Sequence, residues 1–164
     1  MNRALPDAEG RLVLAAVLAA SAADSPDILI DVATLTGAQV VALGPLVGAV
    51  MSNDDGLREA VVDAGRRAGE PMWPMPLPAE LGKGLESAVA DLVNLPADSR
   101  GGGMLIAGLF LQEFVPEGVR WAHLDIAGPA FNESGPHGYT PKGGTGAATR
   151  TLVQVAQDMA DGRL

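Results

Sequence analysis

The stretch Ile28-Leu29-Ile30-Asp31-Val32-Ala33 is short, contains β-branched residues and is almost continuously apolar. This pattern is typical of a central strand that is covered on both faces. The preceding residues, 12–23, are Ala, Leu and Val with a single Ser, which predicts a helix that is buried on all sides. A helix followed by a buried strand is the beginning of an α/β pattern.

Helices and strands continue to alternate along the rest of the chain. Such alternation predicts an α/β fold, a layered α/β/α domain with a mixed, partly parallel sheet. The expected elements are a strand at 46–51, a surface helix capped by Asn53-Asp54-Asp55, a buried helix at 104–115, a strand at 121–126 and a helix at 145–159. The inward side chains of the last helix are expected to be Ala148, Leu152, Val155 and Met159.

Two segments are predicted to lack regular structure. Thr34-Leu35-Thr36-Gly37 reads as a turn, and the prolines between 71 and 78 predict an extended arm at 72–77, with Trp73 and the methionines packed. Only a few strands are then available to cover two helices that are apolar on every side. We therefore expect a neighbouring segment or subunit to cover part of this surface.

The composition fits one folded domain, 1–164, because 164 residues with 48% hydrophobic content can bury a sizeable core. The absence of cysteine excludes disulfides, thiolate zinc sites and cysteine nucleophiles, so oxygen or histidine must bind any metal. A net charge of -9 argues against nucleic-acid and anionic-membrane partners. The apolar stretch near the start is shorter than the roughly 20 residues that span a bilayer and does not resemble a signal peptide, so we expect a cytoplasmic protein.

Several groups of residues allow a functional interpretation. The glycine-rich stretch 142–150 could bind a phosphate, but no strand leads directly into it and the dinucleotide pattern fails at Thr149. Ser134, His137 and Asp125 could act as nucleophile, base and orienting acid, although no G-x-S-x-G motif is present. We interpret His123, in a predicted strand, as a hydrogen-bonded core histidine in preference to a metal ligand.

Asp7 and Glu9 precede the first helix and also allow two interpretations. Acidic residues near a helix N-terminus each stabilise the helix by roughly 0.3 to 1 kcal/mol. Two carboxylates two positions apart on an irregular segment can also converge on divalent metal ions. The spacing alone does not choose between capping and metal binding.

Three stretches of the chain resemble the leucyl aminopeptidase family, also called cytosol aminopeptidases, the two-metal peptidases that remove N-terminal residues. They occur in the family's order and at its approximate spacing, and the resemblance runs from Asp7 almost to the C-terminus. The first closely matches the family signature N-T-D-A-E-G-R-L. The stretches are Asp7-Ala8-Glu9-Gly10-Arg11-Leu12-Val13-Leu14-Ala15, Asp31-Val32-Ala33-Thr34-Leu35-Thr36-Gly37-Ala38 and Trp121-Ala122-His123-Leu124-Asp125-Ile126-Ala127-Gly128.

The resemblance implies a catalytic centre with two divalent ions, Mn or Zn. By position, Asp7 is similar to a metal-ligand aspartate, and Glu9 to the carboxylate that bridges the two metals. Arg11 resembles the arginine that holds a bicarbonate ion, the general base toward the attacking water. The implied reaction is attack by a metal-bound hydroxide on a metal-polarised carbonyl.

The resemblance also implies a site for a peptide substrate. The backbone of Leu35 and Gly37 would hydrogen-bond the peptide, and Thr34 would lie at the pocket for its N-terminal side chain. Ala127 and Ala130 would line the same pocket, and their small size would leave room for a bulky aliphatic residue. The family assembles as hexamers, which implies a homo-oligomer.

The sequence departs from the family pattern at its start. Leu5-Pro6 stands where the family has Asn-Thr, and Pro6 removes a backbone donor next to the expected metal ligand. The family's other ligands, a lysine and two aspartates, and its catalytic lysine belong to stretches that precede the matched ones. We therefore expect 1–164 to be the C-terminal portion of a catalytic domain, incomplete relative to the family, with little activity alone. The alternative is a non-catalytic remnant that acts as an oligomerisation or interaction module.

Overall fold

The computed structural model describes residues 7–86, 92–94 and 101–164, with side chains described from residue 10 onward. Its centre is a four-stranded sheet in the order β1 (Ile28–Ala33), β4 (Arg120–Asp125), β2 (Gly48–Ser52) and β3 (Met72–Pro74). β1 and β4 are parallel, as are β2 and β3, whereas β2 and β4 are antiparallel. The predicted mixed, partly parallel sheet is therefore confirmed.

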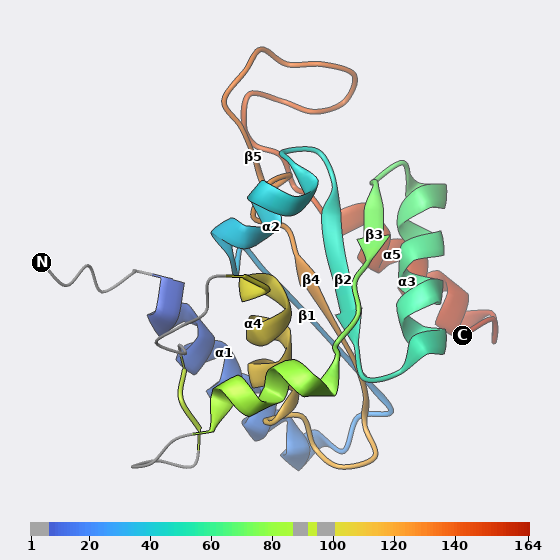
Figure 1. Ribbon diagram of the computed structural model, residues 1–164. Coiled ribbons are helices and arrows are strands. Elements are labelled where there is room, and N and C mark those ends of the chain that lie inside the picture. Colours follow the sequence, from blue (N-terminus) through green and yellow to red (C-terminus); the bar gives the residue numbers. More distant parts are fainter. Residues whose placement is uncertain (1–6, 87–91, 95–100) are drawn as a thin grey trace, which may run out of the picture.

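Helices cover both faces of the sheet (Figure 1). α3 and α5 pack together on one face, while α1, α4 and the 3-10 helix η2 lie on the other. Two short strands, β5 and β6, pair outside the main sheet. The remaining elements are α1 (Asp7–Ala20), η1 (Ser21–Asp24), α2 (Gly37–Leu43), α3 (Asp55–Ala68), η2 (Ala79–Leu85), α4 (Gly103–Gln112), β5 (Phe131–Asn132), β6 (Gly143–Gly144) and α5 (Thr149–Ala160).

Side chains on β4 alternate between the two faces of the sheet. Ala122 and Leu124 enter the core beneath α3 and α5, whereas Trp121 enters the core formed with α1 and α4. One strand contributes apolar side chains to both cores, because successive residues of a strand point to opposite faces of the sheet. β4 and its neighbour β2 are thus the strands that are covered on both faces.

The helix α3 follows the sequence-based prediction closely. The Asp54 side chain caps it by accepting a hydrogen bond from the Leu57 amide at 2.6 Å. Leu57, Val61 and Ala64 are buried on its inner stripe, as predicted. An amphipathic stripe and a capping carboxylate together explain where this helix begins and which face it buries.

Two predictions about buried elements are only partly correct for the described part of the chain. The side chains of β1 pack against a core on each face of the sheet, as predicted, but β1 is an edge strand and is half-buried, because no described strand pairs with its second edge. α1 begins at Asp7, earlier than predicted, and exposes Leu12, Val13 and Val17. Its inner face alone, with Ala15 and Leu18, packs against the core. These segments have the composition of buried elements, but the described residues leave one side of each uncovered.

Three smaller expectations also fail. The turn expected at 34–37 leads directly into α2, whose first turn is capped by the Thr36 side chain. The proline-rich arm contains the short strand β3, in which Trp73 is exposed. In α5, Met159 is exposed, while the neighbouring Asp158 is buried and forms ion pairs with two exposed arginines, Arg67 and Arg163. No helix among the described residues is long and apolar enough to cross a membrane.

Leu18 and Val17 offer a direct test of how α1 packs. Leu18 is 1% exposed and Val17 is 60% exposed on the same helix. Leu18→Ala is expected to lower the free energy of unfolding by about 2–5 kcal/mol, because it leaves a cavity in the core. Val17→Ala should change it by no more than about 0.5 kcal/mol. Urea denaturation of both variants measures the difference, and equal losses would contradict this orientation of α1.

Asp158 joins α5 to α3 and to the end of the chain. It accepts hydrogen bonds from Arg67 and Arg163, the latter at 2.7 Å, and from Gln154 at 3.2 Å. The hydrogen bonds from Arg67 and Arg163 lower the pKa of the Asp158 carboxyl below its ordinary value. A carboxyl group whose pKa is lowered on folding stabilises the fold only while it is ionised.

The stability supplied by Asp158 should therefore depend on pH. It is fully present above the unfolded pKa of about 4 and is lost as the pH falls toward the lower folded pKa. Asp158→Asn is expected to lower the thermal midpoint at pH 7, and the difference from the parent should shrink below about pH 4. Asp161→Asn is the matched control, because Asp161 is exposed and forms an ion pair with one described residue, Arg163. A pH-independent difference measured by circular dichroism would refute this role.

Candidate functional site

The parallel pairing of β1 and β4 brings two loops to one edge of the sheet. Ala33 stands opposite Asp125 in the register, so both strands end at the same level. The loop 34–36 leaves β1 and leads into α2, and the segment 126–130 leaves β4. The residues predicted to bind a substrate all follow these two strand ends. The carboxyl edge of a parallel strand pair is a common place for a ligand site in α/β proteins.

Asp125 connects the two loops through its carboxylate. Its Oδ1 accepts hydrogen bonds from the amides of Leu35 at 3.1 Å and Ala127 at 3.2 Å. Its Oδ2 accepts a hydrogen bond from the hydroxyl of Thr36 at 2.7 Å. Asp125 is 0% exposed, and this burial raises the pKa of its carboxyl, while the hydrogen bond from Thr36 acts in the opposite direction. The three donors compensate the ionised carboxylate for the water that it has lost.

Gln39 makes a second connection between the same loops. Its backbone amide donates to Thr36 Oγ1 at 3.1 Å, and its side-chain oxygen accepts from the Gly128 amide at 2.6 Å. Gln39 is fully buried. A Cβ added at Gly128 would collide with the Gly44 carbonyl oxygen, so only glycine fits there. Thr36, Gln39, Asp125 and Gly128 form a hydrogen-bonded group that we call the loop clamp.

The predicted substrate-binding residues lie around the loop clamp. Thr34 and Gly37 are exposed, and Ala127 and Ala130 are half-buried. Leu35 is buried, and its amide is occupied by Asp125. Its carbonyl oxygen accepts no hydrogen bond from the described residues. Any backbone contact of Leu35 with a ligand must therefore use the carbonyl.

The predicted metal ligands can be placed only by their backbone. Asp7 and Glu9 lie in the first turn of α1, and their side chains are outside the described part of the structure. Arg11 is buried, and its Nη1 donates to the Asn94 carbonyl oxygen at 3.1 Å. Among the described residues, no three His, Asp or Glu side chains come together in a group that could hold a metal ion. The described side chains therefore do not form a metal centre by themselves.

His123 is a core histidine, as predicted. It is 0% exposed, and its Nδ1 lies 2.5 Å from Asp31 Oδ1 on the neighbouring strand. The other oxygen of Asp31 accepts a hydrogen bond from Trp121 Nε1 at 2.6 Å. His123 Nε2 is buried and has no hydrogen-bond partner within the described ranges. The Asp31 carboxylate thus fixes two aromatic side chains of β4, a role that the sequence pattern did not indicate.

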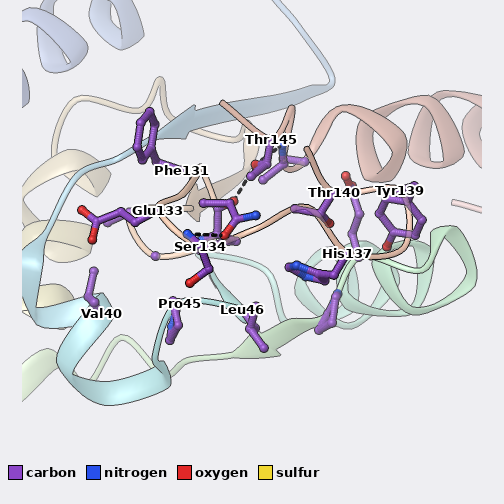
Figure 2. A pocket seen from close by; sticks show the side chains of 18 of the residues that line it. Val40, Pro45, Leu46, Phe131, Glu133, Ser134, His137, Tyr139, Thr140 and Thr145 are labelled. Atoms are coloured by element: carbon purple, nitrogen blue, oxygen red, sulfur yellow. Dashed lines mark hydrogen bonds between the residues drawn. The ribbon is translucent and has the colours of Figure 1, made fainter. Parts of the chain in front are cut away.

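A cavity of about 810 Å³ lies beside the loop clamp. Figure 2 shows Val40, Pro45 and Leu46 facing the loop that carries Ser134 and His137. Of the five residues predicted to bind substrate, only Ala127 lines this cavity.

Two alternative sites lose their basis in this arrangement. The Asp125 carboxylate is hydrogen-bonded to Leu35, Thr36 and Ala127, so it does not orient His137 as a catalytic triad would require. In the proposed phosphate loop, glycines 143 and 144 form β6, and α5 begins only at Thr149. The glycines therefore do not open the helix toward an anion.

Comparison with known proteins gives consistent matches. The family model described as the cytosol aminopeptidase family, catalytic domain, matches residues 5–153. A probable cytosol aminopeptidase of Streptomyces coelicolor is 62% identical over 158 residues, which cover 96% of this chain and 30% of that protein. The corresponding protein of Corynebacterium diphtheriae is 54% identical over 155 residues, covering 94% of this chain and 31% of its own length.

Solved structures agree with the sequence matches. The bottromycin maturation enzyme BotP superimposes with a TM-score of 0.88 at 48% identity, covering 93% of this chain and 34% of that chain. A mutant of tomato leucine aminopeptidase gives a TM-score of 0.81 at 40% identity, and the match covers 90% of this chain and 28% of that chain. A second BotP structure contains Mn. The chain thus has the leucine aminopeptidase fold over about a third of the length of these proteins.

Gly128→Ala tests the close approach on which the loop clamp depends. The added methyl group would overlap the Gly44 carbonyl oxygen, so the 44–46 segment or the Gly128 backbone must move. We expect a loss of about 1–3 kcal/mol in the free energy of unfolding. Gly135→Ala is the control, because a Cβ at Gly135 meets open space. Chemical denaturation compares the two, and a tolerated Gly128→Ala would show that the segment is less constrained than its packing indicates.

Proposed function

This chain belongs to the cytosol aminopeptidase family, and on that premise we propose that it supplies the substrate-binding loops and part of the two-metal site of a metal-dependent aminopeptidase acting on peptide N-termini. One observation carries the proposal. The β1–β4 pairing and the loop clamp hold the stretches 34–37 and 127–130 together, as one site for a peptide requires. The chain spans about 30% of the length of its curated relatives, so the activity itself is proposed and not established.

In this proposal each loop has a distinct task. The Leu35 carbonyl accepts a hydrogen bond from an N–H group of the substrate, and the Gly37 amide at the start of α2 donates one. Ala127, Ala130 and Thr34 surround the N-terminal side chain of the peptide. The small alanines admit a bulky aliphatic residue such as Leu or Met.

The metal-binding part of the site is shared in the same proposal. Asp7 and Glu9 supply carboxylate oxygens, which are hard ligands suited to Mn, and Arg11 holds a bicarbonate ion. The two ions, Mn or Zn, would polarise the scissile carbonyl. In this proposal the other ligands, the family's lysine and two aspartates, would come from further polypeptide of the kind that the longer relatives possess.

We also propose a cytoplasmic homo-oligomer, with a hexamer as the expected form. The name of the relatives, cytosol aminopeptidase, supports the location. The exposed apolar side chains of α1, Leu12, Val13 and Val17, supply surface that further polypeptide could cover. The second candidate function is a non-catalytic interaction module, which Leu5-Pro6 favours because it stands where the family has Asn-Thr beside the proposed metal ligand Asp7.

A chimera tests the proposed activity. The matched 158 residues of the Streptomyces coelicolor relative are replaced by the corresponding part of this chain, and hydrolysis of leucyl anilide is measured with Mn. We expect activity in the chimera and little in the 164-residue chain alone. Glu9→Gln should reduce the activity of the chimera by more than the roughly 10- to 100-fold loss that follows removal of a ligand's outer partner.

Glu117 supplies a control for Glu9→Gln. Glu117→Gln removes the charge of an exposed acidic residue in the loop before β4 and should leave the activity unchanged. A chimera that folds and assembles like the parent enzyme, yet has no peptidase activity, would refute the proposed function. That outcome would favour the interaction module.

A further inference from the structure

We propose that Asp125 is a positioning residue that holds both walls of the substrate pocket in register and thereby determines the preference for the N-terminal side chain. This inference rests on the proposed function and deepens it. Asp125 is fully buried, so its carboxylate acts through the loops that it binds and not by touching the substrate.

The β1–α2 loop forms one wall of the proposed substrate pocket. The peptide unit between Leu35 and Thr36 carries the carbonyl oxygen that is proposed to bind the substrate. Asp125 anchors the groups on either side of this unit, since it accepts hydrogen bonds from the Leu35 amide, in the preceding peptide unit, at 3.1 Å and from the Thr36 side-chain hydroxyl at 2.7 Å. Two flanking anchors restrict the rotation of the peptide unit between them. The direction of the Leu35 carbonyl is therefore restricted before a substrate binds.

The segment that follows β4 forms the opposite wall, and Asp125 also binds this segment. Asp125 Oδ1 accepts the Ala127 amide at 3.2 Å, and the same oxygen accepts the Leu35 amide. One oxygen atom thus links the proposed carbonyl contact to the alanine that lines the pocket. Gln39 closes the ring, because it joins Thr36 to Gly128. Displacement of one wall must move the other.

Substitutions of Asp125 and Thr36 remove different parts of this hydrogen-bonded group. Asp125→Ala would leave the Leu35 and Ala127 amides without an acceptor in a buried place, which is costly. Asp125→Asn keeps one oxygen for the two amides, and its NH₂ group can donate to Thr36 Oγ1. The asparagine variant should therefore preserve the loop positions without the charge. Thr36→Val removes the Thr36 hydroxyl and keeps nearly the same volume.

The chain offers a matched control for Thr36→Val. Thr151 is also buried, and its hydroxyl donates to a buried carboxylate, that of Glu70, at 2.6 Å. It lies in α5, away from the loop clamp. Thr151→Val therefore removes a similar hydrogen bond, one that involves no residue of the loop clamp.

The experiment compares these variants in the chimera, using leucyl and alanyl anilides as substrates. Thr36→Val is expected to raise KM for the leucyl substrate by up to about tenfold and to reduce the leucyl-to-alanyl ratio of kcat/KM. Thr151→Val, at a comparable loss of thermal midpoint, should leave that ratio unchanged. Asp125→Asn should retain the ratio, whereas Asp125→Ala should lose it. If Thr36→Val and Thr151→Val lower the thermal midpoint equally and neither changes the leucyl-to-alanyl ratio of kcat/KM, the proposal is overturned.

Hydrogen exchange makes the inference testable apart from activity. In the 164-residue chain, Asp125→Ala should lower the protection of the Leu35 and Ala127 amides together, while Asp125→Asn should retain it. An effect on one amide alone, or on neither, would overturn the coupling of the two walls. An inactive chimera with the coupled exchange intact would refute the proposed function and leave the positioning role standing.

Discussion

The parallel pairing of β1 with β4 is the constraint on which the rest of the structure depends. It places Asp31 opposite His123 and Ala33 opposite Asp125, although these partners are about ninety positions apart in the chain. Each pair of positions then determines a different property. The first forms a buried polar contact within the sheet, and the second brings together the two loops that follow the strands. A shift of one residue in this register would turn the polar side chains toward the opposite, apolar core.

One group of buried polar residues lies on the β1 side of β4 and at its end. Asp31, Gln39 and Asp125 each make at least two hydrogen bonds, so their removal from water is compensated. A buried acceptor that loses its donor costs more than an average hydrogen bond contributes. The network therefore favours one arrangement of the loops strongly over its alternatives. Close packing restricts the loop clamp as well, because a Cβ at Gly128 would collide with the Gly44 carbonyl oxygen.

The sequence predicts the parts of the fold that local pattern controls. β1 has the predicted bounds, and α3 begins at its predicted acidic cap, because hydrophobic periodicity and capping act within a few residues. α2 was missed because it has only seven residues and begins at a glycine that is equally typical of a turn. Met159 was expected to be buried, but the structure buries the neighbouring Asp158. Hydrophobic periodicity does not reveal that Arg67 and Arg163 neutralise this buried carboxylate. The loop clamp was also beyond prediction, because its hydrogen bonds join residues about ninety positions apart.

The partly incorrect predictions of burial have a physical meaning of their own. The composition of α1 and β1 suits elements that are covered on every side, yet the described residues cover only the inner face of α1 and one edge of β1. The loops that are proposed to bind the substrate, by contrast, are joined within the described chain by the hydrogen bonds of Asp125. Contacts among these residues therefore hold the walls of the proposed pocket, whereas the proposed metal centre requires ligands beyond the described side chains. In this proposal, binding of the peptide and activation of its carbonyl depend on separate structural supports, and these residues supply the first.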